Sequence, residues 1–412
     1  MTEDVEARDT GKRVAIIGAG PGGLSAGLAL HKQGFHVRVF ERHNPMRALG
    51  GAILLNAVGI YILRSYGATV DDIETVDLSE FRRYDGRHRV TWKTDPDLIR
   101  RAGSSGWIAG TMRSEVYDRM LAVMPPEMLV KGANFSHYEE TADGVTVYFE
   151  DGSSYDADLV IGADGVSSRV REQLWGNAKL KDVGVTVHLG WTELEGPPRS
   201  HMLIHHNDKF QFGFAPLRYQ DKDCFEWWFV EKTKKNDRPH ADPAGYVAKN
   251  IRRFAYPIPD LVKPVDSNDR LVRWVVKYKD PLKKWSKGRV TILGDAAHAT
   301  SPYAGYGAGM AIEDGYFLGK FLSGRDLSDL EQVTEGLERY DSERVDYTNR
   351  VTEFAKTLGI VFHRVPWVVR RFRDFMLDHT KVPDKAINKG YTEDALLLLE
   401  SILSEQDPVR ER

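Results

Sequence analysis

The pattern of apolar and polar positions divides the chain into an α/β start, a strand-rich middle and a helical end. The apolar run 13-RVAIIGAG-20 ends at glycine and is typical of a buried parallel strand. Residues 24–34 place apolar side chains at helical spacing and end at a glycine, which predicts a helix. Alternating, β-branched residues at 36–42 predict a second strand, so the chain begins with a βαβ unit.

The next part of the chain predicts one helix and a hairpin. Residues 113–124 have helical spacing, with Ser114 as a suitable N-cap. Segments 144–150 and 154–161 predict strands, and the Asp-Gly pair at 151–152 predicts a tight turn between them.

From about residue 183 to 280, short aromatic-rich strands alternate with turns. This pattern predicts a mostly antiparallel sheet, interrupted by a helix near 243–254. A further buried strand is predicted at 289–295. Helical spacing then continues towards the end of the chain, including about 330–360 and 366–378.

The order of these elements predicts an α/β (α+β) fold. A Rossmann-like dinucleotide-binding domain would carry an inserted, mostly antiparallel sheet domain and C-terminal helices. The predicted bounds are 12–75, 100–180 and 284–325 for the dinucleotide-binding domain, 76–99 and 181–283 for the sheet domain, and 326–412 for the helical region.

Composition narrows the class of protein. The chain has 412 residues and a formal net charge of −3, so no global basic surface attracts nucleic acid. Its only cysteine, Cys224, excludes a cysteine cluster for a metal or an iron–sulfur centre, and we predict no metal site. No apolar run reaches the length of a membrane span. We expect a cytoplasmic monomer or homodimer without stable membrane insertion, and we expect the basic segment 362–376 to pack on the dinucleotide-binding domain.

Glycines at the first predicted turn form a G-x-G-x-x-G motif between a strand and a helix. Gly18 would allow the tight turn, Gly20 the approach of a pyrophosphate, and Gly23 close packing of helix on strand. Glu41 ends the second strand, where an acid meets ribose hydroxyls. The motif and its context predict a dinucleotide site at the helix N-terminus.

Two later segments place an acid and a glycine where a predicted strand ends. The first is 158–172, with Asp164 followed by Gly165, and the second is 293–314, with Gly294 followed by Asp295. In open α/β sheets, ligands bind at the carboxyl ends of the strands. Either segment alone would be interpreted as an ordinary turn without a ligand.

Together, the three segments resemble those of the group A flavoprotein monooxygenases, the single-component aromatic hydroxylases with the p-hydroxybenzoate hydroxylase fold. The resemblance covers about residues 12–325. It implies FAD as cofactor, NADH or NADPH as reductant and O2 as co-substrate, with hydroxylation of a phenolic or heteroaromatic substrate through a flavin C4a-hydroperoxide. The residues that match the family's cofactor-binding positions are Gly18, Gly20, Gly23, Glu41, Arg42, Arg47, Gly51, Arg113, Asp164, Gly165, Gly294, Asp295, Pro302, Gly305, Gly307 and Ala308.

The chain departs from the family at one position beside the flavin. Where the family usually has Gly-Gln-Gly, this chain has a tyrosine, Tyr306, between Gly305 and Gly307. If the side chain at this position contacts substrate or cofactor, the tyrosine would change specificity. If only the backbone matters there, the replacement would have little effect.

The sheet domain is expected to cover the flavin and to bind a small aromatic substrate. Alternation puts Gln211 on one face of its strand and Phe212 and Phe214 on the other, and either face could meet the pocket. The run 227–229 and His298 are expected to be structural. The candidate substrate contacts are Gln211, Phe212, Phe214 and Tyr306, and the candidate catalytic residues are His201, His205, Tyr219 and Tyr303.

Other activities share the same FAD motifs. A tetracycline-type or polycyclic-substrate enzyme that inactivates or epoxidises its substrate stays open, because only the pocket separates it from a hydroxylase. A flavin-dependent halogenase is disfavoured, since the chain lacks the Trp-x-Trp-x-Ile-Pro signature. A protein that binds FAD without catalysis would not oxidise NAD(P)H in response to an aromatic ligand.

Overall fold

The computed structural model describes residues 12–44, 51–76, 78–233, 238–263, 270–305 and 307–404. Two of the predicted site residues, Arg47 and Tyr306, lie outside the described residues. No helix in the described ranges is long and apolar enough to cross a membrane.

A five-stranded parallel sheet forms the first layer, in the order β18-β12-β1-β2-β8. Its strands are β1 (Arg13–Ile17), β2 (His36–Glu41), β8 (Leu129–Lys131), β12 (Leu159–Gly162) and β18 (Val290–Ile292). Every neighbouring pair is parallel. Helices α1 (Pro21–Lys32) and α9 (Gly307–Leu322) pack against each other beside this sheet. The predicted α/β fold class, with its opening βαβ unit, is confirmed.

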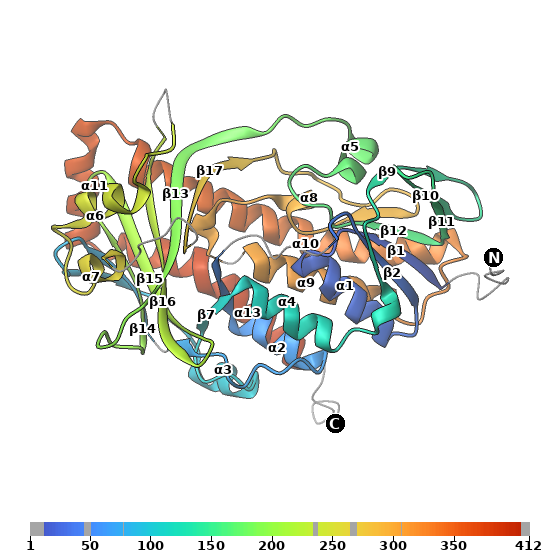
Figure 1. The fold of residues 1–412 in the computed structure, drawn as a ribbon, viewed down its shortest axis with the longest axis horizontal. Helices are drawn as coiled ribbons and strands as arrows, with labels where there is room; N and C mark the ends of the chain where they lie inside the picture. The colour runs from blue at the N-terminus through green and yellow to red at the C-terminus, as the bar shows by residue number, and fades with distance from the viewer. Residues whose placement is uncertain are drawn as a thin grey trace.

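A seven-stranded sheet forms the second layer, in the order β17-β13-β16-β15-β14-β5-β6. Its strands are β5 (Leu78–Arg83), β6 (His88–Thr91), β13 (Lys181–Glu193), β14 (His201–His206), β15 (Phe210–Tyr219), β16 (Lys222–Lys232) and β17 (Leu271–Tyr278). All neighbours are antiparallel except β14 and β5. Figure 1 shows the two sheets towards opposite ends of the molecule's long axis.

The two faces of the seven-stranded sheet have different surroundings. One face packs against α6 (Pro243–Ile251) and α7 (Ile258–Val262) in a separate apolar core. In Figure 1 these helices lie on the side of the sheet away from α1 and α9. The opposite face therefore looks towards the parallel sheet, and the cavity described below lies there.

Two small antiparallel sheets complete the strands. One contains β3 (Ala52–Asn56), β7 (Ile108–Met112) and β4 (Thr75–Val76), and the other contains β9 (Phe135–Glu140), β10 (Val145–Phe149) and β11 (Ser154–Ala157). The predicted turn at 151–152 joins β10 and β11. The single strand predicted at 154–161 is wrong, because the chain changes sheets at Asp158. The Asp158 carboxylate accepts hydrogen bonds from the Arg13 backbone N–H and guanidinium, both at 2.8 Å.

The shorter helices are α2 (Ala57–Ser65), α3 (Pro96–Arg101), α4 (Arg113–Ala122), α5 (Arg169–Trp175) and α8 (Asp295–His298), with single turns at Pro126–Met128 and Pro302–Ala304. The cap predicted for α4 is wrong. The helix starts one residue before Ser114, at the end of β7, and Met112 is its N-cap.

The C-terminal helices are α10 (Leu330–Gly359), α11 (Trp367–His379), α12 (Val382–Asn388) and α13 (Asp394–Ser404), with π turns at Ile360–Arg364 and Lys389–Glu393. The predicted positions of α10 and α11 are confirmed. The expected packing of α11 on the parallel-sheet layer is wrong. Asp378 of α11 pairs with Arg89 of β6 at 2.7 Å, and Trp367 and Phe372 are exposed.

Candidate active site

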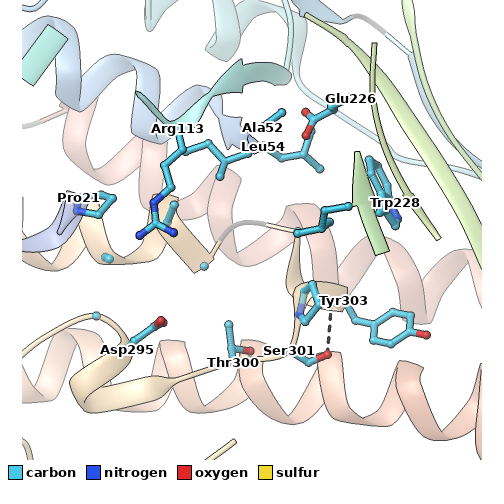
Figure 2. Close-up of a pocket in the computed structure, with 18 of the residues that line it drawn as sticks. Pro21, Ala52, Leu54, Arg113, Glu226, Trp228, Asp295, Thr300, Ser301 and Tyr303 are labelled. Carbon is cyan, nitrogen blue, oxygen red and sulfur yellow. Dashed lines mark hydrogen bonds between the residues drawn. The ribbon is translucent and has the colours of Figure 1, made fainter. Parts of the chain in front are cut away.

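A cavity of about 310 Å³ lies between the carboxyl ends of the parallel strands and the seven-stranded sheet. Its walls come from the first glycine turn, β3, β7, the loop before α9 and the inner face of the large sheet. In Figure 2, Pro21, Arg113 and Asp295 mark one part of this cavity, and Trp228 and Tyr303 mark another. The cavity therefore joins the predicted dinucleotide site to the predicted substrate wall.

The glycine motif shapes one end of the cavity. Gly18 has φ +105°, and an added Cβ would lie 2.4 Å from the carbonyl oxygen of Ala163, so only glycine fits this turn. Gly20 has φ −68° and ψ 173°, and an added Cβ there would have no neighbour closer than the Tyr117 hydroxyl at 3.8 Å. Gly20 and Gly23 line the cavity; Gly20 is the N-cap of α1, which begins at Pro21, and Gly23 lies in the first turn of that helix. This cradle presents helix N–H groups to a ligand.

Glu41 stands behind the glycine turn rather than in the cavity wall. One carboxylate oxygen accepts from the Ala19 backbone N–H at 3.1 Å, and the other accepts from the His43 backbone N–H at 2.9 Å. The His43 ring lies 2.8 Å from that second oxygen. Arg42, which follows Glu41, is exposed and does not line the cavity.

Asp164, the acid that follows β12, forms hydrogen bonds with the backbone that follows in its own segment. One Asp164 oxygen accepts from the backbone N–H groups of Arg169 at 2.7 Å and Val170 at 3.3 Å, at the start of α5. The other oxygen is buried without a hydrogen-bond partner among the described residues, and burial raises the pKa of Asp164. Gly165, the next residue, lines the cavity.

Asp295, the acid that follows β18, points into the cavity (Figure 2), whereas Asp164 binds its own segment. Asp295 is exposed to the cavity, and Figure 2 shows its side chain pointing into it. Its carboxylate accepts no hydrogen bond from another described residue. The backbone N–H of Gly294, just before it, donates to Asp314 at 2.9 Å. The turn is thus held from behind, while Asp295 stays available to a ligand.

A buried charge network supports this turn. Asp314 also contacts the His298 ring at 2.6 Å and accepts from Arg344 at 2.8 Å. Arg344 donates to Glu313 at 2.8 Å as well. Almost no surface of these four side chains is exposed. His298 therefore has the structural position that the sequence indicates.

The loop before α9 forms the floor of the cavity. Pro302, Tyr303, Gly305, Gly307 and Ala308 line it. Gly305 has φ +77°, a backbone conformation that favours glycine, and α9 begins at Gly307.

Tyr303 is held in this floor through its backbone carbonyl. The Tyr391 hydroxyl donates to the Tyr303 carbonyl oxygen at 2.5 Å, which ties the loop to the C-terminal helices. The Tyr303 hydroxyl has no hydrogen-bond partner among the described residues, and burial raises the pKa of Tyr303 well above its ordinary value.

The inner face of the large sheet forms the opposite wall. Gln211 lies on this face, whereas Phe212 and Phe214 lie in the separate core under α6 and α7. The expectation that the run 227–229 serves only sheet packing is wrong, because Trp228 lines the cavity. The other cavity residues on this face are Leu189, Met202, Ile204, Glu226, Val230 and Trp274.

The histidines predicted to be catalytic do not line the cavity. His205 is buried beside Phe214, and burial lowers the pKa of His205 to about 3. His201 lies 2.9 Å from the Ser200 hydroxyl, and Tyr219 packs on Trp191 at 5.3 Å between ring centroids. Of the four candidates, the structure brings only Tyr303 to the cavity.

Sequence reasoning missed Glu226, which lines the cavity and is 6% exposed. The available signal was an acid inside an apolar strand, 225-FEWWFVE-231, two positions before Trp228 and hence on the same face. Gly51 is described but does not line the cavity.

The cofactor end of the cavity suits a dinucleotide. The open surface at Gly20 leaves room for phosphates. The Arg113 guanidinium faces the cavity and pairs with no carboxylate among the described residues, and its Nε is buried without a partner. Asp295 offers an acceptor to hydroxyl groups. These residues fit a molecule with phosphates and a polyol chain, such as FAD.

Comparison with known proteins agrees with this geometry. The FAD binding domain family matches residues 12–355. The chain is 28% identical over 345 residues to 6-hydroxynicotinate 3-monooxygenase of Pseudomonas fluorescens, covering 75% of this chain and 82% of that protein. It is also 28% identical over 355 residues to FAD-dependent urate hydroxylase of Klebsiella pneumoniae, covering 81% and 86%.

A solved structure shares the fold. HpxO of Klebsiella pneumoniae, complexed with FAD and uric acid, matches with a TM-score of 0.78 and 24% identity over 94% of this chain and 97% of that one. The family match spans more than half of the chain and includes all three motifs that end at the cavity. The chain therefore belongs to the FAD-binding domain family, among the FAD-dependent aromatic monooxygenases of the group A flavoprotein type.

Proposed function

We propose that this protein uses NADH or NADPH and O2 to hydroxylate a small aromatic or heteroaromatic ring. The observation that supports this most directly is that one continuous cavity has the glycine cradle at one end and an aromatic sheet face at the other. The two curated relatives above carry names of enzymes that act on hydroxynicotinate and urate, which are heteroaromatic.

Bound FAD would supply the chemistry of nicotinamide oxidation and oxygen activation, and the chain would supply binding and orientation. The cradle at Gly20 and the guanidinium of Arg113 would hold the phosphates, and Asp295 would hold hydroxyl groups of the ribityl chain. The N–H groups at the start of α9 point a helix N-terminus at the cavity, which favours negative charge there.

The sheet side would hold the substrate ring away from water. Trp107, Leu189 and Trp228 provide apolar surface for a flat ring, and Gln211 adds a hydrogen-bonding group. Exclusion of water protects reactive species and strengthens polar contacts inside the cavity. Tyr303 lies in the loop before α9, in the part of the cavity that Trp228 also lines (Figure 2), and is proposed to contact the ring because its buried hydroxyl has no hydrogen-bond partner among the described residues.

A test of the reaction needs product mass as well as turnover. The FAD-loaded protein is expected to oxidise NADH or NADPH faster when a suitable phenol or heteroaromatic ring is added, and the ring should gain one oxygen atom. Labelled O2 should put its label in the product. Halogenation or a purely structural flavin would give another mass or no stimulated turnover, and peroxide without a hydroxylated ring for every compound would reject the proposal.

Arg113→Met is expected to weaken FAD binding by about tenfold to a hundredfold. A hydrogen bond to a charged group contributes about 1.5–3 kcal/mol, and methionine keeps the length of the side chain but loses the charge. Titration of the apoprotein with FAD, followed by flavin fluorescence, measures the change in Kd.

Arg119→Met on the same helix is the matched control. Arg119 pairs with Asp72 through two 2.7 Å hydrogen bonds and does not line the cavity. Its variant is expected to bind FAD like the wild type. Equal losses in both variants would mean that α4 as a whole, rather than the Arg113 charge, affects FAD binding.

A further inference from the structure

Glu226 is the acidic side chain on the substrate wall of the cavity. It lies in the middle of β16 and is 6% exposed. Its Oε1 is buried beside Gly110 of β7, close enough that a Cβ added to Gly110 would lie 2.7 Å away. Gly110 pairs with Leu54 of β3, and Figure 2 shows Glu226 near the labelled Leu54 and Ala52.

Neither a hydrogen bond nor a charge from a described residue compensates for the burial of the Glu226 carboxyl group. Its Oε1 has no hydrogen-bond partner among the described residues, although buried polar atoms are nearly always paired. Burial raises the pKa of Glu226 well above its ordinary value, and no neighbouring charge contributes to this change. Burial therefore favours the protonated form of this group, which has one O–H donor and one carbonyl acceptor.

The charges around the cavity restrict what can bind there. Among the described residues that line it, Arg113 is the one cation, and it lies at the end proposed for FAD. The described wall around Glu226 contains Met202, Ile204 and Trp228 and offers no lysine, arginine or histidine. An aromatic carboxylate placed against this wall would lose its hydration without gaining a positive partner.

We propose that Glu226 recognises the substrate, and that the substrate is an uncharged aromatic ring with an amide-like edge, in which an N–H stands beside an acceptor, rather than an aromatic carboxylate. A protonated carboxyl group matches such an edge with two hydrogen bonds once the side chain turns Oε1 from Gly110 towards the ring. Its O–H donates to the acceptor of the ring, and its carbonyl oxygen accepts from the N–H of the ring. The inference rests on the proposed function, because it names the kind of ring that the same cavity takes.

Two ligands of nearly equal shape test this preference. 3-Hydroxybenzamide has the amide edge, and 3-hydroxybenzoate has a carboxylate in its place. Binding to the FAD-loaded protein can be measured by calorimetry or by the change in flavin absorbance. The wild type is expected to bind the amide at least about tenfold more tightly, because a site built to hydrogen-bond a group rejects an analogue that leaves it unpaired.

Two variants assign the preference to Glu226. Glu226→Gln keeps the shape and the pattern of the protonated acid, an N–H donor beside a carbonyl acceptor, so it should keep the preference for the amide. Glu226→Leu offers neither donor nor acceptor and should lose the preference for the amide. Glu193→Gln, at a half-buried acid on β13 that pairs with Lys222 and does not line the cavity, is the control and should keep the wild-type ratio.

The pH dependence gives a readout that a merely structural role would not change. The protonated form of Glu226 exists below its raised pKa, so amide binding to the wild type should weaken as the pH rises through that value. Binding to Glu226→Gln should show no such dependence. The proposal is rejected if the wild type binds the benzoate as tightly as the amide, binds neither ligand, or keeps its ratio in Glu226→Leu. A ring that gains no oxygen would instead reject the proposed reaction, whatever the binding ratio.

Discussion

Arg344→Met is expected to lower the free energy of unfolding by about 3–5 kcal/mol, the usual cost of leaving a buried charge without its partner. Arg344 lies on α10 with no exposed side-chain surface, and it donates to Asp314 and Glu313 at 2.8 Å each. Burial works against the charged form of Asp314, yet His298 and Arg344 hold the pKa of Asp314 below its ordinary value. Chemical denaturation of the apoprotein measures the loss.

The same variant should also weaken FAD binding, because the network holds the cofactor site. The Asp314 oxygen that contacts the His298 ring also accepts from the Gly294 backbone N–H, so a shift of Asp314 moves the turn that carries Asp295. Arg339→Met on the same helix is the control. Arg339 is exposed and pairs with Glu335 one helical turn away, a kind of pair that contributes about 0.3–0.5 kcal/mol. Similar losses in the two variants would contradict a special role of the buried network.

The cofactor end of the cavity could be predicted from the sequence because it depends on local backbone geometry. The turn itself requires Gly18, and Gly20 leaves open space for a ligand. Both requirements fall within one short segment, so they leave a recognisable sequence motif. The strands that carry the three motifs are β1, β12 and β18, which lie side by side in the sheet. Three turns far apart in the sequence therefore meet at one edge, a meeting that the sequence indicates only through resemblance to a family.

The substrate end could not be predicted in the same way. Alternation along β15 separates Gln211 from Phe212, but the packing of α6 and α7 decides which face is covered. That packing joins segments far apart in the chain, and no local pattern reports it. The catalytic histidines were proposed from the ordinary pKa of the residue type, whereas burial removes His205 from that range. Glu226 was missed because an acid within an aromatic strand gains meaning only when its neighbours across the cavity are known.

Gly20→Val is expected to lower FAD affinity at least about a hundredfold, or about 2.7 kcal/mol, while leaving the apoprotein folded. The backbone angles of Gly20, φ −68° and ψ 173°, suit any residue, and the nearest atom to an added Cβ is 3.8 Å away. The added side chain would instead fill the space in front of the α1 N–H groups, where the phosphates are proposed to bind. FAD titration measures affinity, and thermal melting of the apoprotein measures folding.

Gly18→Val should fail for a different reason, and the contrast between the two glycines is the decisive part of the test. At φ +105°, with an added Cβ 2.4 Å from the Ala163 carbonyl oxygen, the Gly18 variant must distort the turn itself. Its apoprotein should therefore melt at a lower temperature, whereas the Gly20 variant should melt like the wild type. If Gly20→Val binds FAD normally, the phosphates do not lie at this cradle. If it unfolds like Gly18→Val, Gly20 is needed for the turn rather than for the ligand.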